Sequence, residues 1–239
     1  MIVHRTAPAT LPAGERVYAI GDVHGCLDRL RALHHAVAAD IAARPVASAT
    51  LVHLGDYVDR GPDSAGVLGL LADEAPPAGV SVVVNLLGNH EAMMLDALTG
   101  RSPLAVRHWL LNGGDATLRS LGLEDEVDPA AWASRLPARW LEFLRTLALT
   151  HGAGGYLFVH AGLRPGVPIT AQTREDLLWI REPFLSAAAS FGAVAVHGHT
   201  PVPAPVVRPN RIGIDTGAVM GGRLTCAVLE EDQIGFLDS

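Results

Sequence analysis

Five short polar motifs carry the residues of this sequence that could do chemistry, and each directly follows an apolar stretch. The motifs are GDVHG at 21–25, GDYVDRG at 55–61, GNHE at 88–91, HAG at 160–162 and HGHT at 197–200. They offer carboxylate, imidazole and amide ligand atoms and no thiolate. This set suits Mn, Fe or Zn better than a thiolate zinc site or an all-oxygen calcium cage. It also exceeds what one catalytic metal needs, so we expect two divalent ions, which suit in-line displacement at phosphorus.

A plainer interpretation exists for each motif taken alone. In LVHLGDYVDRGPDS (51–64), Asp56, Asp59 and Arg60 could form a solvated turn with a local salt bridge. A lone histidine at a strand end is usually a structural residue. Five such motifs at matching positions are not explained by solvated turns, and the glycines beside them permit tight turns and close backbone approach. We therefore interpret the five motifs as parts of one site.

The elements that must position these motifs alternate between strand and helix in the first part of the chain. Strands are expected at 16–23 and 49–56, a turn followed by a strand within 76–87, and helices at 26–43, 63–74 and 90–98. Later strands are expected at 155–162, 193–200, 204–217 and 222–231, with one helix at 173–182. This order predicts an α/β fold, in which ligands bind outside the carboxyl ends of the strands. The stretch 103–149 differs, because its Trp and Leu residues lie in segments broken by proline, and we expect it to be a helical insert.

Composition limits the remaining possibilities. Residues 1–15 lack periodicity and are expected to form a loose N-terminal arm, followed by a single domain at 16–239. The net charge of −7 argues against nucleic-acid binding, which needs a basic face. Two cysteines form no disulfide framework, and neither a signal peptide nor a membrane span is apparent. These features lead us to expect a cytoplasmic protein with no membrane partner.

Together the motifs resemble those of the metallophosphoesterase superfamily, and more narrowly its phosphoprotein phosphatase family, the bacterial and phage serine/threonine phosphatases of the lambda-phosphatase type. The resemblance runs from about Tyr18 to the C-terminal strands and includes HWLLNGG (108–114), LLWIRE (177–182) and IDTGAV (214–219). It implies a four-layer α/β/β/α fold, a central β-sandwich flanked by helices. In a related pattern, GHxH, position 201 would be histidine, whereas this chain has Pro201 and fits the phosphatase version.

The resemblance also implies roles for individual residues. Asp22, His24 and Asp56 would hold one metal ion, and Asp56, Asn89, His160 and His199 the other, with manganese expected and iron or zinc possible. His197 is the alternative to His199, but the motif places the ligand directly after Gly198. A hydroxide bridging the two ions would attack phosphorus.

Four side chains would then act on the substrate. Arg60 and Arg181, with Asn89, would bind the phosphate oxygens, as planar guanidinium groups do well. His90 would protonate the leaving alkoxide, and Asp59 would fix its tautomer and raise its pKa. The expected activity is hydrolysis of phosphate monoesters, chiefly phosphoserine and phosphothreonine in proteins.

Two rival functions remain open at this point. The first is a symmetrical bis(5'-nucleosyl)-tetraphosphatase, whose family shares GDVHG, GNH and GHTP but typically has GDLVARG and GNHD; Asp59 and Glu91 argue against it here. The second is a catalytically silent binding module, which would have lost a ligand or the acid, and none is missing. Small phosphorylated molecules or nucleotides therefore stay on the list of possible substrates.

Overall fold

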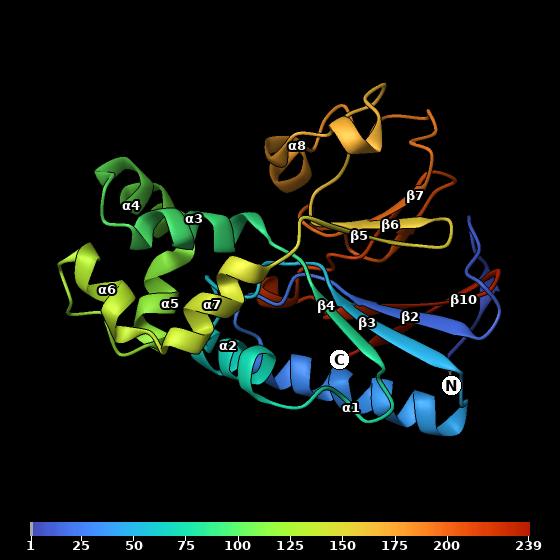
Figure 1. Ribbon diagram of the computed structural model, residues 1–239, viewed down its shortest axis with the longest axis horizontal. Helices are drawn as coiled ribbons and strands as arrows, with labels where there is room; N and C mark the ends of the chain where they lie inside the picture. Colours follow the sequence, from blue (N-terminus) through green and yellow to red (C-terminus); the bar gives the residue numbers. More distant parts are fainter. Residues whose placement is uncertain (1) are drawn as a thin grey trace.

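Two β-sheets packed face to face form the centre of the computed structural model, which describes residues 2–239, and helices cover the outer face of each sheet (Figure 1). The six-stranded sheet has the order β1 (Arg5–Thr6), β11 (Gln233–Asp238), β10 (Thr225–Glu230), β2 (Glu15–Ile20), β3 (Ser48–His53), β4 (Val82–Asn85). The five-stranded sheet has the order β5 (Thr150–Ala153), β6 (Tyr156–Val159), β7 (Val194–His197), β9 (Arg211–Gly213), β8 (Val206–Val207). The expected four-layer α/β/β/α architecture is confirmed.

Period-two alternation along the strands divides the apolar residues among three cores. On β2, Tyr18 and Ile20 pack toward α1 (Leu27–Ala43), while Val17 and Ala19 face the second sheet. The helix side of the first sheet also includes α2 (Ser64–Asp73). The outer side of the second sheet packs against α8 (Arg174–Trp179) through residues such as Leu177. Each layer is thus held to the next by its own cluster of buried side chains.

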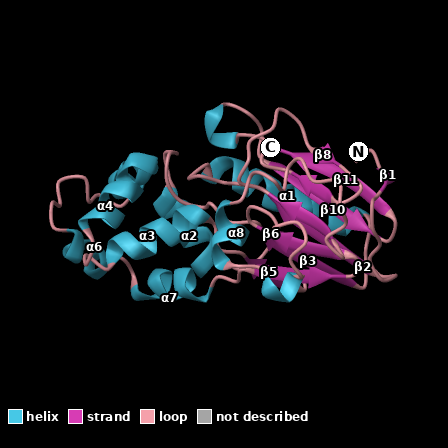
Figure 2. Ribbon diagram, turned by 90° about the horizontal axis from the view of Figure 1, so that it is seen from above, coloured by secondary structure: helices cyan, strands magenta, loops and turns pink. Residues whose placement is uncertain are grey.

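The helical insert expected around 103–149 is present and lies to one side of both sheets (Figures 1 and 2). It follows α3 (Asn89–Leu98) and consists of α4 (Pro103–Trp109), a π-helical turn η1 (Leu110–Gly114), α5 (Asp115–Ser120), α6 (Pro129–Arg135) and α7 (Ala138–Thr146). Two short 3₁₀ turns, η2 (Ile169–Ala171) and η3 (Ala218–Met220), complete the elements. No helix in residues 2–239 is long and apolar enough to cross a membrane.

The N-terminal stretch for which we expected a loose arm contains ordered contacts. Arg5 and Thr6 pair with Ile234 and Gln233 in antiparallel register. Leu11 is 5% exposed and belongs to the core between the sheets. Strands β1, β5 and β11 are additions to the elements expected from the sequence.

The direction of the strands determines where the five motifs lie in the fold. β2, β3 and β4 run parallel to one another, and so do β6, β7 and β9. The carboxyl ends of parallel strands lie at the same edge of their sheet. The loops after β2, β3, β4, β6 and β7, which carry the motifs, therefore meet at one end of the sandwich.

Candidate metal centre

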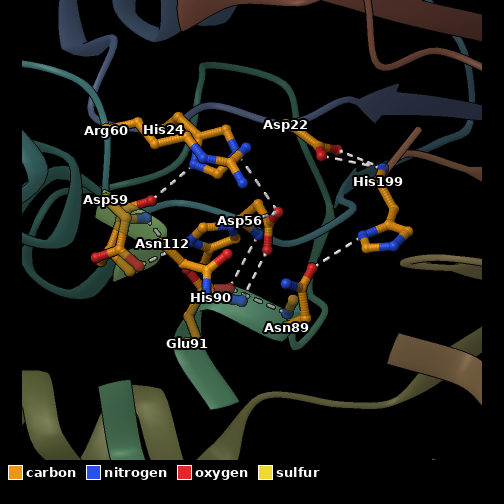
Figure 3. A network of polar contacts seen from close by, with 12 residues as sticks. Asp22, His24, Asp56, Asp59, Arg60, Asn89, His90, Glu91, Asn112 and His199 are labelled. Carbon is orange, nitrogen blue, oxygen red and sulfur yellow. Dashed lines mark hydrogen bonds and ion pairs between the residues drawn. The ribbon is translucent and has the colours of Figure 1, made fainter. Parts of the chain in front are cut away.

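The loops at this end of the sandwich hold an unusual backbone. Six non-glycine residues in 2–239 have positive φ, and five of them lie in the motifs: His24, Asp56, Asp59, Arg60 and His199. The sixth, Glu231, lies in a turn between two strands. Left-handed φ values are unfavourable for residues with a Cβ atom and gather at functional sites. The strain in this chain is therefore concentrated where the motifs converge (Figure 3).

Two groups of buried side chains could each hold a metal ion. In each, the ligand atoms lie within 4.8 Å of one another: His24, Asp56 and His90 in the first, and Asp56, His160 and His199 in the second. Asp56 belongs to both, as a bridging carboxylate must. Burial alone would raise its pKa, but the surrounding histidines, His160 foremost, outweigh burial and hold the pKa of Asp56 below its ordinary value. Asp56 is therefore ionised and available as a ligand.

The histidines present lone pairs to these groups. Nδ1 of His24 lies 2.8 Å from the carbonyl oxygen of Val58, and Nδ1 of His160 lies 2.9 Å from that of Leu54. A carbonyl can only accept, so each Nδ1 carries the proton and each Nε2 is left with a lone pair. Burial lowers the pKa of both rings, to about 4 for His24, which keeps them neutral. Neutral imidazoles held in one tautomer by a backbone carbonyl are good metal ligands.

Asn89 and His160 provide a direct test of whether a cation fits. Oδ1 of Asn89 lies 2.9 Å from Nε2 of His160 and 2.9 Å from Nδ1 of His199. Because Nε2 of neutral His160 carries no proton, two acceptors face each other. Turning the Asn89 amide would offer an N–H donor to His160 instead, whereas the inward oxygen is a ligand atom that a cation can use. The donors present therefore fit a divalent ion.

Asp22 lies beside the two donor groups and in neither of them. Its carboxylate accepts the backbone N–H of His199 at 3.0 and 3.2 Å. Burial, and then the nearby carboxylates of Asp215 and Asp56, raise the pKa of Asp22 well above its ordinary value. A cluster of buried carboxylates is stabilised by a cation, so Asp22 too is placed to gain from one.

His197, the alternative ligand, points elsewhere. Its Nδ1 lies 3.0 Å from the carbonyl oxygen of Gly198, and its ring packs edge-on against Phe184, with centroids 4.9 Å apart. It belongs to neither donor group. The preference for His199, the histidine directly after Gly198, as the metal ligand agrees with this geometry.

The two arginines expected to bind phosphate both lie near the centre. Nη1 of exposed Arg60 donates to Nε2 of His24 at 3.0 Å, so a guanidinium cation meets the lone pair that faces the first donor group. Arg181 is also exposed, and its charge contributes, after burial, to the lowered pKa values of His160 and His199. The positive charges of both arginines therefore act on the donor groups.

His90, a member of the first donor group, forms a buried pair with Asp59 (Figure 3). Oδ2 of Asp59 lies 2.7 Å from Nδ1 of His90, and Nε2 of His90 lies 3.9 Å from Oδ2 of Asp56. Burial alone would lower the pKa of His90, but Asp56 and Asp59 outweigh it and raise that pKa above its ordinary value. Asp59 thus holds the His90 ring in one orientation, and the two carboxylates favour its protonated form.

Glu91 has a function that we did not assign from the sequence. Its fully buried carboxylate accepts four backbone N–H groups, those of Asp56, Tyr57, Val58 and Gly88, at 2.7–3.1 Å. These bonds fix the loop after β3 on the start of α3. The only signal in the sequence was the last letter of GNHE, which we used as a family marker.

A cleft of about 500 Å³ opens beside the centre, between α3, α4 and α8. Its wall includes Trp179, which meets His199 edge-on, with centroids 6.2 Å apart, and stacks on His108, with centroids 5.9 Å apart. Asp96, Arg174 and Glu175 also line it. There is therefore room next to the donor groups for a substrate larger than phosphate.

Comparison with known proteins agrees with this chemistry. A serine/threonine-protein phosphatase 1 from Salmonella typhimurium is 35% identical over 90% of this chain and 92% of its own length. The asymmetrical bis(5'-nucleosyl)-tetraphosphatase PrpE of Bacillus velezensis is 32% identical over 86% of each. Several other relatives are named symmetrical bis(5'-nucleosyl)-tetraphosphatases.

Solved structures and family models agree as well. The crystal structure of a candidate diadenosine tetraphosphatase superposes with a TM-score of 0.67 at 25% identity, covering 97% of this chain and 98% of that one. The family model for calcineurin-like phosphoesterases matches residues 15–234, nearly the whole chain. The protein with this paired Asp, His and Asn centre therefore belongs to the calcineurin-like phosphoesterase family, a group of metal-dependent hydrolases.

Proposed function

We propose that this protein hydrolyses phosphate monoesters, with phosphoserine and phosphothreonine side chains of proteins as substrates, as a bacterial or phage serine/threonine phosphatase of the lambda type. The observation that carries the proposal is the 2.7 Å contact between buried Asp59 and His90. A serine alkoxide is a very poor leaving group and needs a proton from a general acid, whereas a nucleotide phosphate leaves with little help. A general acid such as His90, held in place by Asp59, therefore contributes most to the hydrolysis of an alkyl phosphate.

The metal ligands proposed are those implied by the motifs. Asp22, His24 and Asp56 would hold one divalent ion, and Asp56 the other together with Asn89, His160 and His199; manganese is our first choice. Two ions at such a site lower the pKa of water and neutralise negative charge on the phosphate. The role of the protein is to keep the histidines neutral, which burial does, and correctly oriented, as the bonds to Val58 and Leu54 do.

Substrate handling falls to the side chains around the centre. Arg60 and Arg181 bind the non-bridging phosphate oxygens, for which Arg60 leaves its contact with His24. His90 gives the proton at Nε2 to the leaving oxygen, and Asp59 holds Nδ1 of the imidazole while this happens. The cleft beside Trp179 takes the part of the substrate beyond the phosphate.

Hydrolysis of a dinucleoside tetraphosphate is the second candidate. The relatives named as tetraphosphatases support it, both the asymmetrical one and the symmetrical ones, and the 25% identical solved structure does too. The 35% identical serine/threonine-protein phosphatase supports the first candidate. Family membership is compatible with both substrates. The two candidates must therefore be separated by the activity on substrates with different leaving groups.

A side-by-side assay separates the candidates. The Mn²⁺-loaded protein is given a phosphoserine peptide, a phosphotyrosine peptide and diadenosine tetraphosphate, and kcat/KM is measured for each, with Asp56→Asn as the control for contaminating phosphatases. We expect the highest value on phosphoserine. A far higher value on the dinucleotide would overturn the proposal, and the products would name the activity: ADP alone for symmetrical cleavage, or AMP with ATP for asymmetrical cleavage.

A further inference from the structure

Two residues of the helical insert also donate to the carboxylate of Asp59, the partner of His90. Nε1 of Trp109 donates to both oxygens, at 2.9 Å to Oδ1 and 3.0 Å to Oδ2. Oγ1 of Thr117 donates to Oδ1 at 2.7 Å. All three side chains are fully buried. Asp59 is thus bonded both to His90 at the start of α3 and to residues on α4 and α5 of the insert.

The hydrogen bonds around Thr117 form a closed set. The backbone N–H of Asp59 donates to Oγ1 of Thr117 at 2.9 Å and to Oγ of Ser64 at 3.1 Å. Oγ1 of Thr117 also lies 3.1 Å from Oγ of Ser64. Because the single hydroxyl proton of Thr117 goes to Asp59, its lone pairs accept the other two groups. Both the main chain and the side chain of Asp59 therefore depend on Thr117.

The π-helical turn η1 lets the insert come this close. A Cβ on Gly114 would lie 2.6 Å from the indole of Trp109, and one on Gly113 would lie 2.8 Å from Cγ of Arg60. Gly113 has φ +103 and accepts the backbone N–H of Arg60 at 3.1 Å. A side chain at 113 would push the insert away from the Asp59–Arg60 turn, and one at 114 would displace the indole of Trp109. The π-turn, a feature often found at functional sites, brings the donors of the insert to Asp59.

We propose that Trp109 and Thr117 are positioning residues for catalysis, which set the Asp59 carboxylate so that His90 presents its acidic proton to the leaving group. A carboxylate that accepts only from His90 could rotate and tilt the imidazole. The donors of the insert fix the plane of the carboxylate and hence the direction of Nε2 of His90. This inference rests on the proposed role of His90, and it gives the insert a part in the chemistry.

The test removes one donor at a time while keeping shape. Trp109→Phe removes the indole N–H, and Thr117→Val removes the hydroxyl. Trp132→Phe is the matched control, because Trp132 is also buried in the insert and its ring lies edge-on to Trp109, 5.7 Å away, but its N–H donates to the carbonyl of Glu126. Thr117→Ser keeps the hydroxyl and serves as the rescue variant. Asp59→Asn removes the acceptor itself.

The readout is the ratio of kcat on a phosphoserine peptide to kcat on p-nitrophenyl phosphate, whose leaving group needs little protonation. We expect Trp109→Phe and Thr117→Val to lower kcat on phosphoserine about 10–100-fold, the range typical of lost outer partners. Their kcat on p-nitrophenyl phosphate and both KM values should change little. Trp132→Phe and Thr117→Ser should keep the wild-type ratio. The indole N–H resonance of Trp109 should also shift in Asp59→Asn.

Two results would overturn the inference. Equal losses on both substrates, or a Trp132→Phe variant as selective as Trp109→Phe, would mean that the insert acts only through packing. If Trp109→Phe fails to fold, Thr117→Val and its serine partner decide alone. Asp59→Asn separates failure of this inference from failure of the proposed function. If Asp59→Asn loses kcat only on phosphoserine while the Trp109 and Thr117 variants do not, this inference alone is wrong. If Asp59→Asn loses no more on phosphoserine than on p-nitrophenyl phosphate, the acid role of His90 and this inference are both wrong.

Discussion

Nε2 of His160 and Oδ1 of Asn89 lie 2.9 Å apart, and neither atom has a proton to share. The proton of His160 is on Nδ1, where it is donated to the carbonyl of Leu54 at 2.9 Å. Burial lowers the pKa of this ring, so the neutral form is the relevant one. The second donor group is therefore arranged for a cation, and the protein should be measurably more stable when one is bound.

This relationship predicts a metal-linked change in stability. Binding stabilises the folded state by RT ln(1 + [L]/Kd), about 2.7 kcal/mol when Mn²⁺ is present at 100 times its Kd. Thermal unfolding with Mn²⁺ and with EDTA should show this difference for the wild type. Asp56→Asn, which removes the carboxylate shared by both groups, should lose the difference, the bound metal and all activity together. If the Tm of the wild type is the same with Mn²⁺ and with EDTA, the metal centre is contradicted. Replacement of the exposed Asp125 by Asn is the control and should leave the difference in Tm unchanged.

Replacement of His90 by Asn should show what the buried acid contributes. General acids typically contribute ~10²–10⁴-fold, so kcat on a phosphoserine peptide should fall by about this factor. The loss on p-nitrophenyl phosphate should be much smaller, because p-nitrophenolate leaves without a proton. Metal content measured on the same samples shows whether the centre has survived. Equal losses on the two substrates in a fully metallated variant would remove His90 from the acid role.

The order of strands and helices from β2 to α3 could be predicted because apolar periodicity is a local property. Strands β5 and β11 were not predicted, since THGA (150–153) and QIGFLD (233–238) contain glycine and polar residues and become strands only through pairing with β6 and β10. Propensity is a weak guide where tertiary pairing decides.

The same division between local and long-range information applies to the site. The motifs at strand ends could be found because the end of a strand is visible in the sequence, and the edge of a parallel sheet then brings those ends together. The contacts of Trp109 and Thr117 with Asp59 span 50 and 58 residues. They depend on how the insert packs, which local patterns in the sequence do not show.

Shortening Glu91 should destabilise the protein as well as the metal centre. Glu91→Asp withdraws the carboxylate by one methylene from four backbone N–H groups, which then lack acceptors in a buried loop. Unsatisfied buried donors cost about 1–3 kcal/mol each, so we expect a loss of roughly 3 kcal/mol or more in the free energy of unfolding.

Urea denaturation and Mn²⁺ titration of the same variant check this prediction. Affinity for Mn²⁺ should fall in parallel with stability, because Asp56 lies in the released loop. Glu142→Gln on exposed α7 should match the wild type in both measurements. Unchanged stability in Glu91→Asp would mean that the loop after β3 holds its shape without these bonds.

The acid limit of stability should depend on a cluster far from the metal centre. Nε and Nη2 of Arg16, a residue only 2% exposed, donate to the two carboxylate oxygens of Glu230 at 2.9 and 2.8 Å. This hydrogen bonding lowers the pKa of Glu230. A group whose pKa is lower in the folded state stabilises it above the unfolded value, about 4.3, and this stabilisation disappears as the pH falls through the folded pKa.

Glu230→Gln should therefore lower the free energy of unfolding by about 1–2 kcal/mol at pH 7, and by progressively less below about pH 4. This loss is at the low end for hydrogen bonds to charged groups because Glu230 is partly exposed. The matched control is Glu74→Gln, which loses an equivalent two-pronged contact with Arg31 on the open surface, at 2.6 and 3.0 Å. Exposed pairs contribute little, so this variant should unfold as the wild type does. Urea denaturation between pH 3 and 7 measures both, and a Glu230→Gln deficit that stays constant with pH would show that the lost bond is not coupled to ionisation of the carboxylate.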